Sequence, residues 1–292
     1  MIAPAVGLPR PPAHRTLRRF ARHRLAVVGS AFLLIVVLLA AAAPVVSFND
    51  PYRVDLRARG KPPSAEHVLG TELAGRDVWA RVVYGGQVSL GVGGTSIALA
   101  GVIGIILGAL AGFYRGLVDQ VIMRLADIIL TLPTLVIILA LVSFVGPSVY
   151  NVMLVIGALG WPGLARLVRA QFLSLRERDF VLAAWAVGAD DWRVIRQHIL
   201  PNAVGPIVVW ASFGIAGAIL TEAALSFLGF GVQPPTASWG NMLNAALSIQ
   251  VIQLMPWVWI PPGLAVTLTV LSVNFVGDAL RDALDARSTA VR

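Results

Sequence analysis

Long apolar runs follow one another along almost the whole chain and are separated by short polar segments. Six of these runs are predicted to be membrane-crossing helices, and their approximate ranges are 25–46, 82–114, 122–145, 151–167, 202–220 and 257–276. At 1.5 Å per residue the first run would reach roughly 33 Å, enough to cross the hydrocarbon core of a bilayer. The pattern predicts an all-α membrane protein with six transmembrane helices.

One segment, residues 180–202 with the sequence FVLAAWAVGADDWRVIRQHILPN, interrupts this pattern and is called the polar island below. It contains two short amphipathic helical patterns. Asp179 is predicted to cap the first, Gly188 to end it with a positive φ, and Asp190 to cap the second. Pro201 is expected to end the second helix and to begin the fifth span. A hairpin lying on the membrane surface with its arginines at the headgroups is an alternative interpretation.

The composition excludes several classes of function. Hydrophobic residues make up 57% of the 292 residues and charged residues only 13%, against about 25% in ordinary soluble domains. Cysteine is absent, so disulfides, thiolate chemistry and iron–sulfur clusters are excluded. The net charge of +8 comes from basic residues that flank the apolar runs and form no continuous groove, which argues against nucleic-acid binding.

The arginines also predict an orientation. They concentrate in the first 24 residues, in and around the polar island, and at the C-terminus, whereas the short loops after the third and fifth spans contain neither Lys nor Arg. Both termini and the polar island are therefore expected on the cytoplasmic side, the N-in/C-in arrangement of a multi-pass protein of the cell membrane. A cleaved signal peptide is the alternative for the first run, but that run exceeds the usual 7–15 apolar residues.

Four features inside the spans suggest packing or function. Gly104, Gly108 and Gly112 recur every four residues and predict a face against which another helix packs closely. Asp127 follows Arg124 by three residues, which predicts an ion pair within one helix turn. Glu222 has no basic residue within twenty positions of it along the chain. Its carboxylate is expected either to tie parts of the structure together or to belong to a pathway or gate. Pro133 is expected to kink the third span.

These segments together resemble a known family. The polar island is similar to the cytoplasmic coupling loop of ATP-binding-cassette importer permeases, which carries Glu-Ala-Ala, three residues, Gly, and a later Leu-Pro. This chain has Ala183-Ala184, Gly188 and Leu200-Pro201, with Leu182 in place of the family's Glu. Residues 67–90 and 220–243 also resemble stretches of the C-type subunit of dipeptide, oligopeptide and nickel importers. From residue 18 onward nearly the whole chain shares this resemblance.

The resemblance implies the type I ABC importer fold and a domain plan. That plan has a cytoplasmic tail at 1–24, a first transmembrane helix at 25–46, an extracytoplasmic segment at 47–84, a five-helix transmembrane domain at 85–280 with a coupling loop at 172–201, and a tail at 281–292. It also implies that the loop residues dock on an ATPase. The expected docking residues are Phe180, Leu182, Ala183, Ala184, Trp185, Gly188, Ala189, Asp190, Trp192, Arg193 and Pro201.

The implied function is that of a permease subunit without catalytic residues or cofactors of its own. Its single lysine, Lys61, precedes a proline, so no phosphate-binding GxxxxGK[ST] loop exists, and ATP and Mg would be held by partner ATPases. The implied partners are a second, B-type permease, two ATPase domains, an extracytoplasmic substrate-binding protein and membrane lipid. Peptides are the expected substrates, with nickel or glutathione-like solutes as alternatives. A secondary transporter, the alternative from another class, would need an inverted repeat that this sequence does not display.

Overall fold

The computed structural model describes residue 20 and residues 23–284, and within them the chain is built from helices. The single β-type feature of this described part is an isolated bridge between Thr71 and Asp77. The long helices are α2 (Arg24–Ala41), α4 (Val78–Tyr114), α5 (Gly116–Thr131), α6 (Thr134–Val145), α7 (Val149–Arg176), α10 (Leu200–Phe227) and α13 (Pro256–Leu284). The shorter ones are α3 (Ala43–Val46), η1 (Leu56–Ala58), α8 (Asp179–Ala186), α9 (Asp191–Arg193), η2 (Val194–Ile199), α11 (Trp239–Leu243), η3 (Asn244–Leu247) and α12 (Ile249–Leu254).

The apolar runs account for the spans. Five helices are long and apolar enough to cross a membrane, and the bent pair of α5 and α6 makes a sixth. The prediction of an all-α membrane protein with six spans is confirmed in this form. The predicted tail at 1–24 lies almost entirely outside the described residues, and of the predicted tail at 281–292 only residues 281–284, the end of α13, are described.

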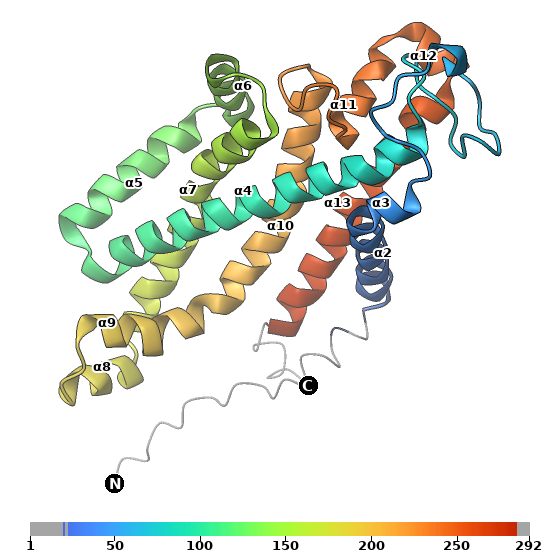
Figure 1. Cartoon of the computed structure of the whole chain (residues 1–292). Coiled ribbons are helices and arrows are strands. Elements are labelled where there is room, and N and C mark those ends of the chain that lie inside the picture. Colours follow the sequence, from blue (N-terminus) through green and yellow to red (C-terminus); the bar gives the residue numbers. More distant parts are fainter. Residues whose placement is uncertain (1–19, 21–22, 285–292) are drawn as a thin grey trace.

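The helices form one bundle with two distinct ends (Figure 1). The longest helix, α4, has 37 residues and a length of about 55 Å, and it runs obliquely across the bundle. It packs most extensively on α7, while α13 packs between α10 and α2. Helices α8 and α9 lie at one end, and α11 and α12 lie at the other. These are called the α8 end and the α11 end below.

Three prolines shape the spans in different ways. Pro133 stands between α5 and α6, which meet at 90°, so the predicted kink is a full break. Pro44 lies in the first turn of α3, just beyond the end of α2, so the first apolar run becomes two helices. Pro201 does not end a helix, contrary to the prediction. Residues 191–227 form one continuous helix, and the π-helical turn η2 directly precedes the proline.

The π turn explains why Pro201 is tolerated. A proline in an α-helix removes one N–H donor and presses its ring against the carbonyl four residues earlier. A π turn shifts the hydrogen bonding by one residue, and here the Leu200 amide donates to the Ile195 carbonyl five residues earlier. The widened turn accommodates the ring without breaking the helix.

The span limits also differ from the sequence-based ranges. α7 continues beyond the predicted end near residue 167 to Arg176, because Val168 and Phe172 on its last turns are fully buried. α4 begins at Val78, so the last residues of the predicted extracytoplasmic segment are already helical. Residues 47–77 fold over the start of α4 and the start of α13, where the Trp257 indole N–H donates to the Thr71 carbonyl over 3.2 Å.

Candidate functional site

The polar island forms a helical hairpin at the α8 end. Its first helix, α8, begins at Asp179, with Arg178 rather than the predicted Asp179 in the cap position. Val181 and Ala184 face inward and are buried against Phe172 of α7 and Val194 of η2, within one apolar cluster. This inward stripe at i and i+3 holds α8 on the bundle.

The hairpin bends at Gly188, which has φ +85° as the sequence predicted. The Gly188 amide donates to the Trp185 carbonyl over 2.9 Å, and the Ala189 amide donates to the Ala184 carbonyl over 3.0 Å. These two hydrogen bonds are the pair that defines a Schellman motif, which satisfies the last carbonyls of a helix. A Cβ added at Gly188 would meet no atom within 4 Å, so the requirement for glycine comes from the backbone conformation alone.

The second half of the hairpin starts at Asp190. This residue occupies the cap position of α9, as predicted, although its side chain makes no capping hydrogen bond. Its carboxylate instead lies 3.9 Å from the Nε of Arg193. Both side chains are exposed, so this pair contributes little to stability.

The structure divides the predicted docking residues into two groups. Ala184, Trp185 and Ala189 pack inward, and the Trp185 ring lies 5.5 Å from the Arg176 guanidinium carbon and 6.1 Å from the Phe113 ring. Pro201 is half-buried at the start of α10. The remaining residues are exposed: Phe180, Leu182, Ala183, Gly188, Asp190, Trp192 and Arg193.

Four apolar side chains of the hairpin remain exposed, and together they are called the apolar patch below. It consists of Phe180, Leu182, Val187 and Trp192, with exposed fractions of 43%, 51%, 85% and 66%. Leu182, which replaces the Glu of the family pattern, adds to this patch where a carboxylate would have interrupted it. Val187 was not predicted as a site residue, because the family pattern of the coupling loop includes its neighbour Gly188 but not this position.

Ion pairs join α7 to α5 and to the turn before it, near the hairpin. Asp127 pairs with Arg166 of α7 at 2.5 Å, so the predicted pair with Arg124 is wrong. Asp119 binds Arg169 through both carboxylate oxygens, and Arg115 pairs with Glu177 at 2.7 Å. Helix spacing permitted the pair with Arg124, but the adjacent helix supplies a closer cation.

The three spaced glycines of α4 lie against α7. A Cβ at Gly104 would come within 2.9 Å of the Leu164 side chain, and one at Gly108 within 2.6 Å of the Ala165 carbonyl. At Gly112 it would come within 2.6 Å of the Phe172 Cβ. These approaches leave no room for a side chain, so the two helices pack closely over about two turns.

Glu222 lies at the α11 end, in α10, and is fully buried. It accepts hydrogen bonds from the Ser89 hydroxyl of α4 at 2.9 Å and from the Ser226 hydroxyl at 2.7 Å. Ser89 in turn accepts from the Trp239 amide, and Ser226 accepts from the Val232 amide. Of the two interpretations left open by the sequence, this geometry is that of a tie between helices.

Two further residues at this end escaped sequence reasoning. Arg81, which seemed to flank the second span, is only 2% exposed; its Nε lies 3.3 Å from Glu72, and it donates to the Pro51 and Pro235 carbonyls. Trp239 is also buried, and its indole donates to the Val82 carbonyl over 2.9 Å. Their partners are distant in sequence, so no spacing rule reveals them.

Comparison with known proteins identifies relatives along nearly the whole chain. Residues 104–289 match the family described as binding-protein-dependent transport system inner membrane component. Residues 12–63 match the N-terminal TM domain of oligopeptide transport permease C. The expectation raised by the sequence motifs is confirmed.

Individual relatives agree with these family matches. A putative peptide permease protein of Brucella suis biovar 1 (strain 1330) is 43% identical over 277 residues, covering 95% of this chain and 92% of the relative. The dipeptide transport system permease protein of Alkalihalophilus pseudofirmus is 40% identical over 276 residues, covering 94% and 90%. Among solved structures, the MetNI methionine ABC transporter in an inward-facing conformation matches with a TM-score of 0.54 and 19% identity, covering 70% of this chain and 95% of that chain. The last match supports the fold alone.

Proposed function

The chain belongs to the binding-protein-dependent transport system inner membrane components, and from this premise we propose that it is the permease subunit forming half of the pathway of an ATP-driven peptide importer. It is a multi-pass membrane protein. The names of its relatives favour peptides as the substrates over nickel or glutathione-like solutes.

The complete importer needs chains beyond this one. A second, B-type permease would supply the other half of the pathway, and an extracytoplasmic binding protein would deliver the peptide. Two ATPase domains would bind ATP and Mg and carry out hydrolysis, so this subunit performs no catalysis. Membership of the family supports this division of labour.

The polar island is the proposed contact with the ATPases. The observation that carries this assignment is the exposed apolar patch of Phe180, Leu182, Val187 and Trp192 on a hairpin anchored to the bundle by buried side chains. Exposed apolar patches of this kind mark interaction sites on proteins. The assignment puts the α8 end in the cytoplasm, in agreement with the distribution of arginines.

The hairpin can act as a lever because its parts are fixed to one another. Val181 and Ala184 join α8 to α7, and the continuous helix through η2 joins the other arm to α10. A displacement imposed on the patch is therefore transmitted to two spans. Reversing a two-state equilibrium from 1:99 to 99:1 needs about 5.5 kcal/mol of differential binding, which ATP-driven closure of the partners would provide.

Substitution of Gly188 tests the lever. In the reconstituted importer, Gly188→Val should reduce peptide uptake at least tenfold while ATP hydrolysis continues, because a β-branched residue is strained at φ +85° and the angle of the hairpin changes. Gly146→Val is the matched control: Gly146 has φ +99°, also has no atom within 4 Å of an added Cβ, and lies between α6 and α7, outside the island. Unchanged uptake by Gly188→Val, or an equal loss in both variants, would contradict the proposal.

A further inference from the structure

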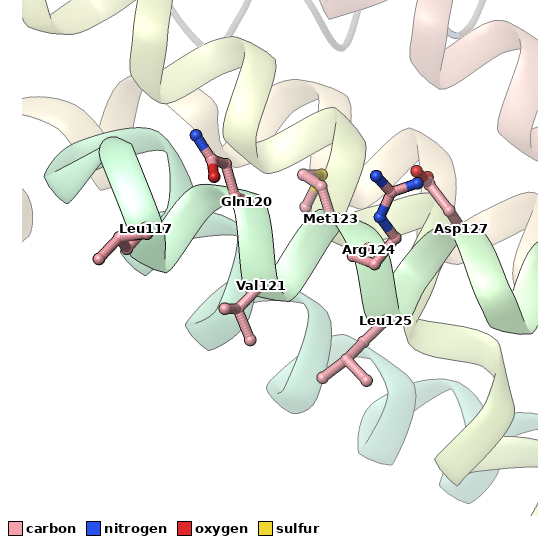
Figure 2. Close-up of a pocket in the computed structure, with 7 residues that line it drawn as sticks. All are labelled: Leu117, Gln120, Val121, Met123, Arg124, Leu125 and Asp127. Carbon is pink, nitrogen blue, oxygen red and sulfur yellow. The ribbon is translucent and has the colours of Figure 1, made fainter.

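A polar stripe runs along α5, outside the hairpin. Gln120, Arg124, Asp127 and Thr131 follow one another at i, i+4, i+7 and i+11 and therefore share one face of the helix. Figure 2 shows the polar groups of Gln120, Arg124 and Asp127 on the opposite side of α5 from Leu117, Val121 and Leu125. The stripe lies between this exposed apolar side and the buried residues Ile122 and Ala126, which pack toward α4 and α7.

Arg124 is the unmatched charge of this stripe. Asp127 is already paired with Arg166, and Asp119, farther round the helix, is paired with Arg169. Within the described part of the chain, no carboxylate lies within ion-pair distance of Arg124, and its side chain is exposed. Arg124, Asp127 and Arg166 together hold two cations and one anion, so the stripe carries one net positive charge.

The surroundings of Arg124 require a polar counterpart. It is the ninth residue of α5, about 12 Å from the start of the helix, and α5 and α6 together form a bent pair that is apolar enough to be a broken membrane span. Charged side chains at membrane depth face water, a cavity or an opposite charge rather than lipid. A groove of about 570 Å³ lies along α5, and it is lined by Gln120, Arg124 and Asp127 of the stripe together with the apolar residues Leu117, Val121, Met123 and Leu125.

We propose that the α5 stripe lines the aqueous route of the transported peptide and that Arg124 receives the peptide's C-terminal carboxylate in transit. This inference rests on the function proposed above. The stripe extends from Gln120 to Thr131, about 16 Å along the helix axis, which matches roughly five residues of extended peptide. The Gln120 amide can both donate to and accept from a peptide backbone. A phosphate headgroup would need only a cation at the membrane surface and would leave most of this length unused.

The absence of cysteine from the chain makes a charge-swap experiment possible. Arg124→Cys is assembled with cysteine-free partners in liposomes, and uptake of a radiolabelled dipeptide is measured before and after reaction with membrane-impermeant thiosulfonates. We expect uptake to fall about tenfold in Arg124→Cys. A trimethylammonium reagent should restore at least half of it by returning a cation, and a sulfonate reagent should restore none. Arg124→Lys should transport nearly as well as the wild type.

Two controls separate the outcomes. Val118→Cys, an exposed apolar position of α5 that does not line the groove, should transport normally with either reagent. ATP hydrolysis stimulated by the binding protein should persist in Arg124→Cys, which shows that the complex has assembled. If the wild-type complex fails to take up dipeptide with ATP, the proposed function fails, independently of Arg124.

Several results would overturn the inference about Arg124 alone. Normal uptake by Arg124→Cys would do so, as would equal effects of the two reagents. Loss of complex assembly that only the cationic reagent repairs would assign Arg124 to a carboxylate of the partner permease. An effect of the variant in phosphatidylglycerol vesicles that vanishes in phosphatidylcholine vesicles would assign it to a lipid headgroup.

Discussion

The two ends of the bundle differ in which side chains they bury and which they expose. At the α11 end, Arg81, Glu222 and Trp239 are at most 2% exposed, and each has polar partners from distant parts of the chain. At the α8 end, Val187 and Trp192 are mainly exposed, although both are apolar. The α11 end buries charged and polar side chains together with their partners, whereas the hairpin at the α8 end leaves apolar side chains exposed.

This difference shows which side chains have their interactions within the subunit and which remain uncovered. A buried charge is tolerated only when its partners are present, so Arg81 and Glu222 have their interactions fixed within this subunit. An exposed apolar patch loses favourable burial energy until something covers it, and under the proposed function an ATPase would cover the patch at the α8 end. Substitutions at the first end should therefore change stability, and substitutions at the second should change assembly.

Loss of Arg81 should have the largest effect on stability. Arg81→Leu leaves the half-buried Glu72 with Arg76 alone and deprives the Pro51 and Pro235 carbonyls of their donor. Removal of one partner from a buried ion pair costs about 3–5 kcal/mol. Unfolding in detergent, followed by circular dichroism, should show a corresponding fall in the unfolding free energy.

Arg59 provides the control for this substitution. It is exposed and lies in the segment that precedes α4, and no ion pair within the described residues includes it. Arg59→Leu should change the unfolding free energy by no more than about 0.5 kcal/mol. Equal effects of the two substitutions would mean that the α11 end is not held together by its buried charge.

Loss of Glu222 should have an intermediate effect. Glu222→Ala removes the acceptor of the Ser89 and Ser226 hydroxyls and weakens the tie between α4 and α10. Unsatisfied buried polar groups cost about 1–3 kcal/mol each, and rotation of the hydroxyls keeps the expected loss near 2 kcal/mol. The comparison is sharpened by Glu177→Ala at the α8 end, where the exposed pair with Arg115 should be worth less than about 1 kcal/mol. A larger loss for Glu177 than for Glu222 would reverse the proposed contrast.

The apolar spans could be predicted because membrane helices are defined by composition over about twenty residues. The bend at Gly188 could be predicted because only its own backbone is involved. The Asp127 pair could not, since Arg166 reaches it from another helix, 39 positions along the chain. The hydrogen bond from Ser89 to Glu222 joins residues 133 positions apart. The contacts that could not be predicted are thus those between different spans, because the sequence pattern does not specify how one span is aligned along another.

Pro201 shows a different limit of sequence reasoning. The prediction treated proline as a helix end, because the missing donor and the ring clash disfavour an α-helix. The chain instead changes the helix type over Val194–Ile199 and continues. A π turn has no sequence signature of its own, so the continuous helix from the polar island into the span was not foreseen. In the proposed function, that continuity is the feature that would let the hairpin act as a lever.

Trp192 should give the smallest change in stability and the clearest change in assembly. Its side chain is 66% exposed, so Trp192→Ala should alter the unfolding free energy of the isolated subunit by no more than about 0.5 kcal/mol. If the apolar patch is the ATPase contact, the same substitution removes a buried aromatic anchor from the interface, worth about 2 kcal/mol or roughly thirtyfold in affinity. Titration of the ATPases onto the permease pair in nanodiscs measures this loss.

Phe144 separates an effect of the patch from an effect of exposed aromatics in general. Phe144 is 95% exposed but lies at the end of α6, far along the chain from the hairpin. Phe144→Ala should leave ATPase affinity unchanged. If both variants bind the ATPases as tightly as the wild type, the patch at the α8 end is not the docking surface, and its exposure needs another partner. If only Trp192→Ala weakens binding, the ATPases cover the exposed apolar groups at the α8 end. The buried charges at the α11 end, in contrast, have their partners within the chain.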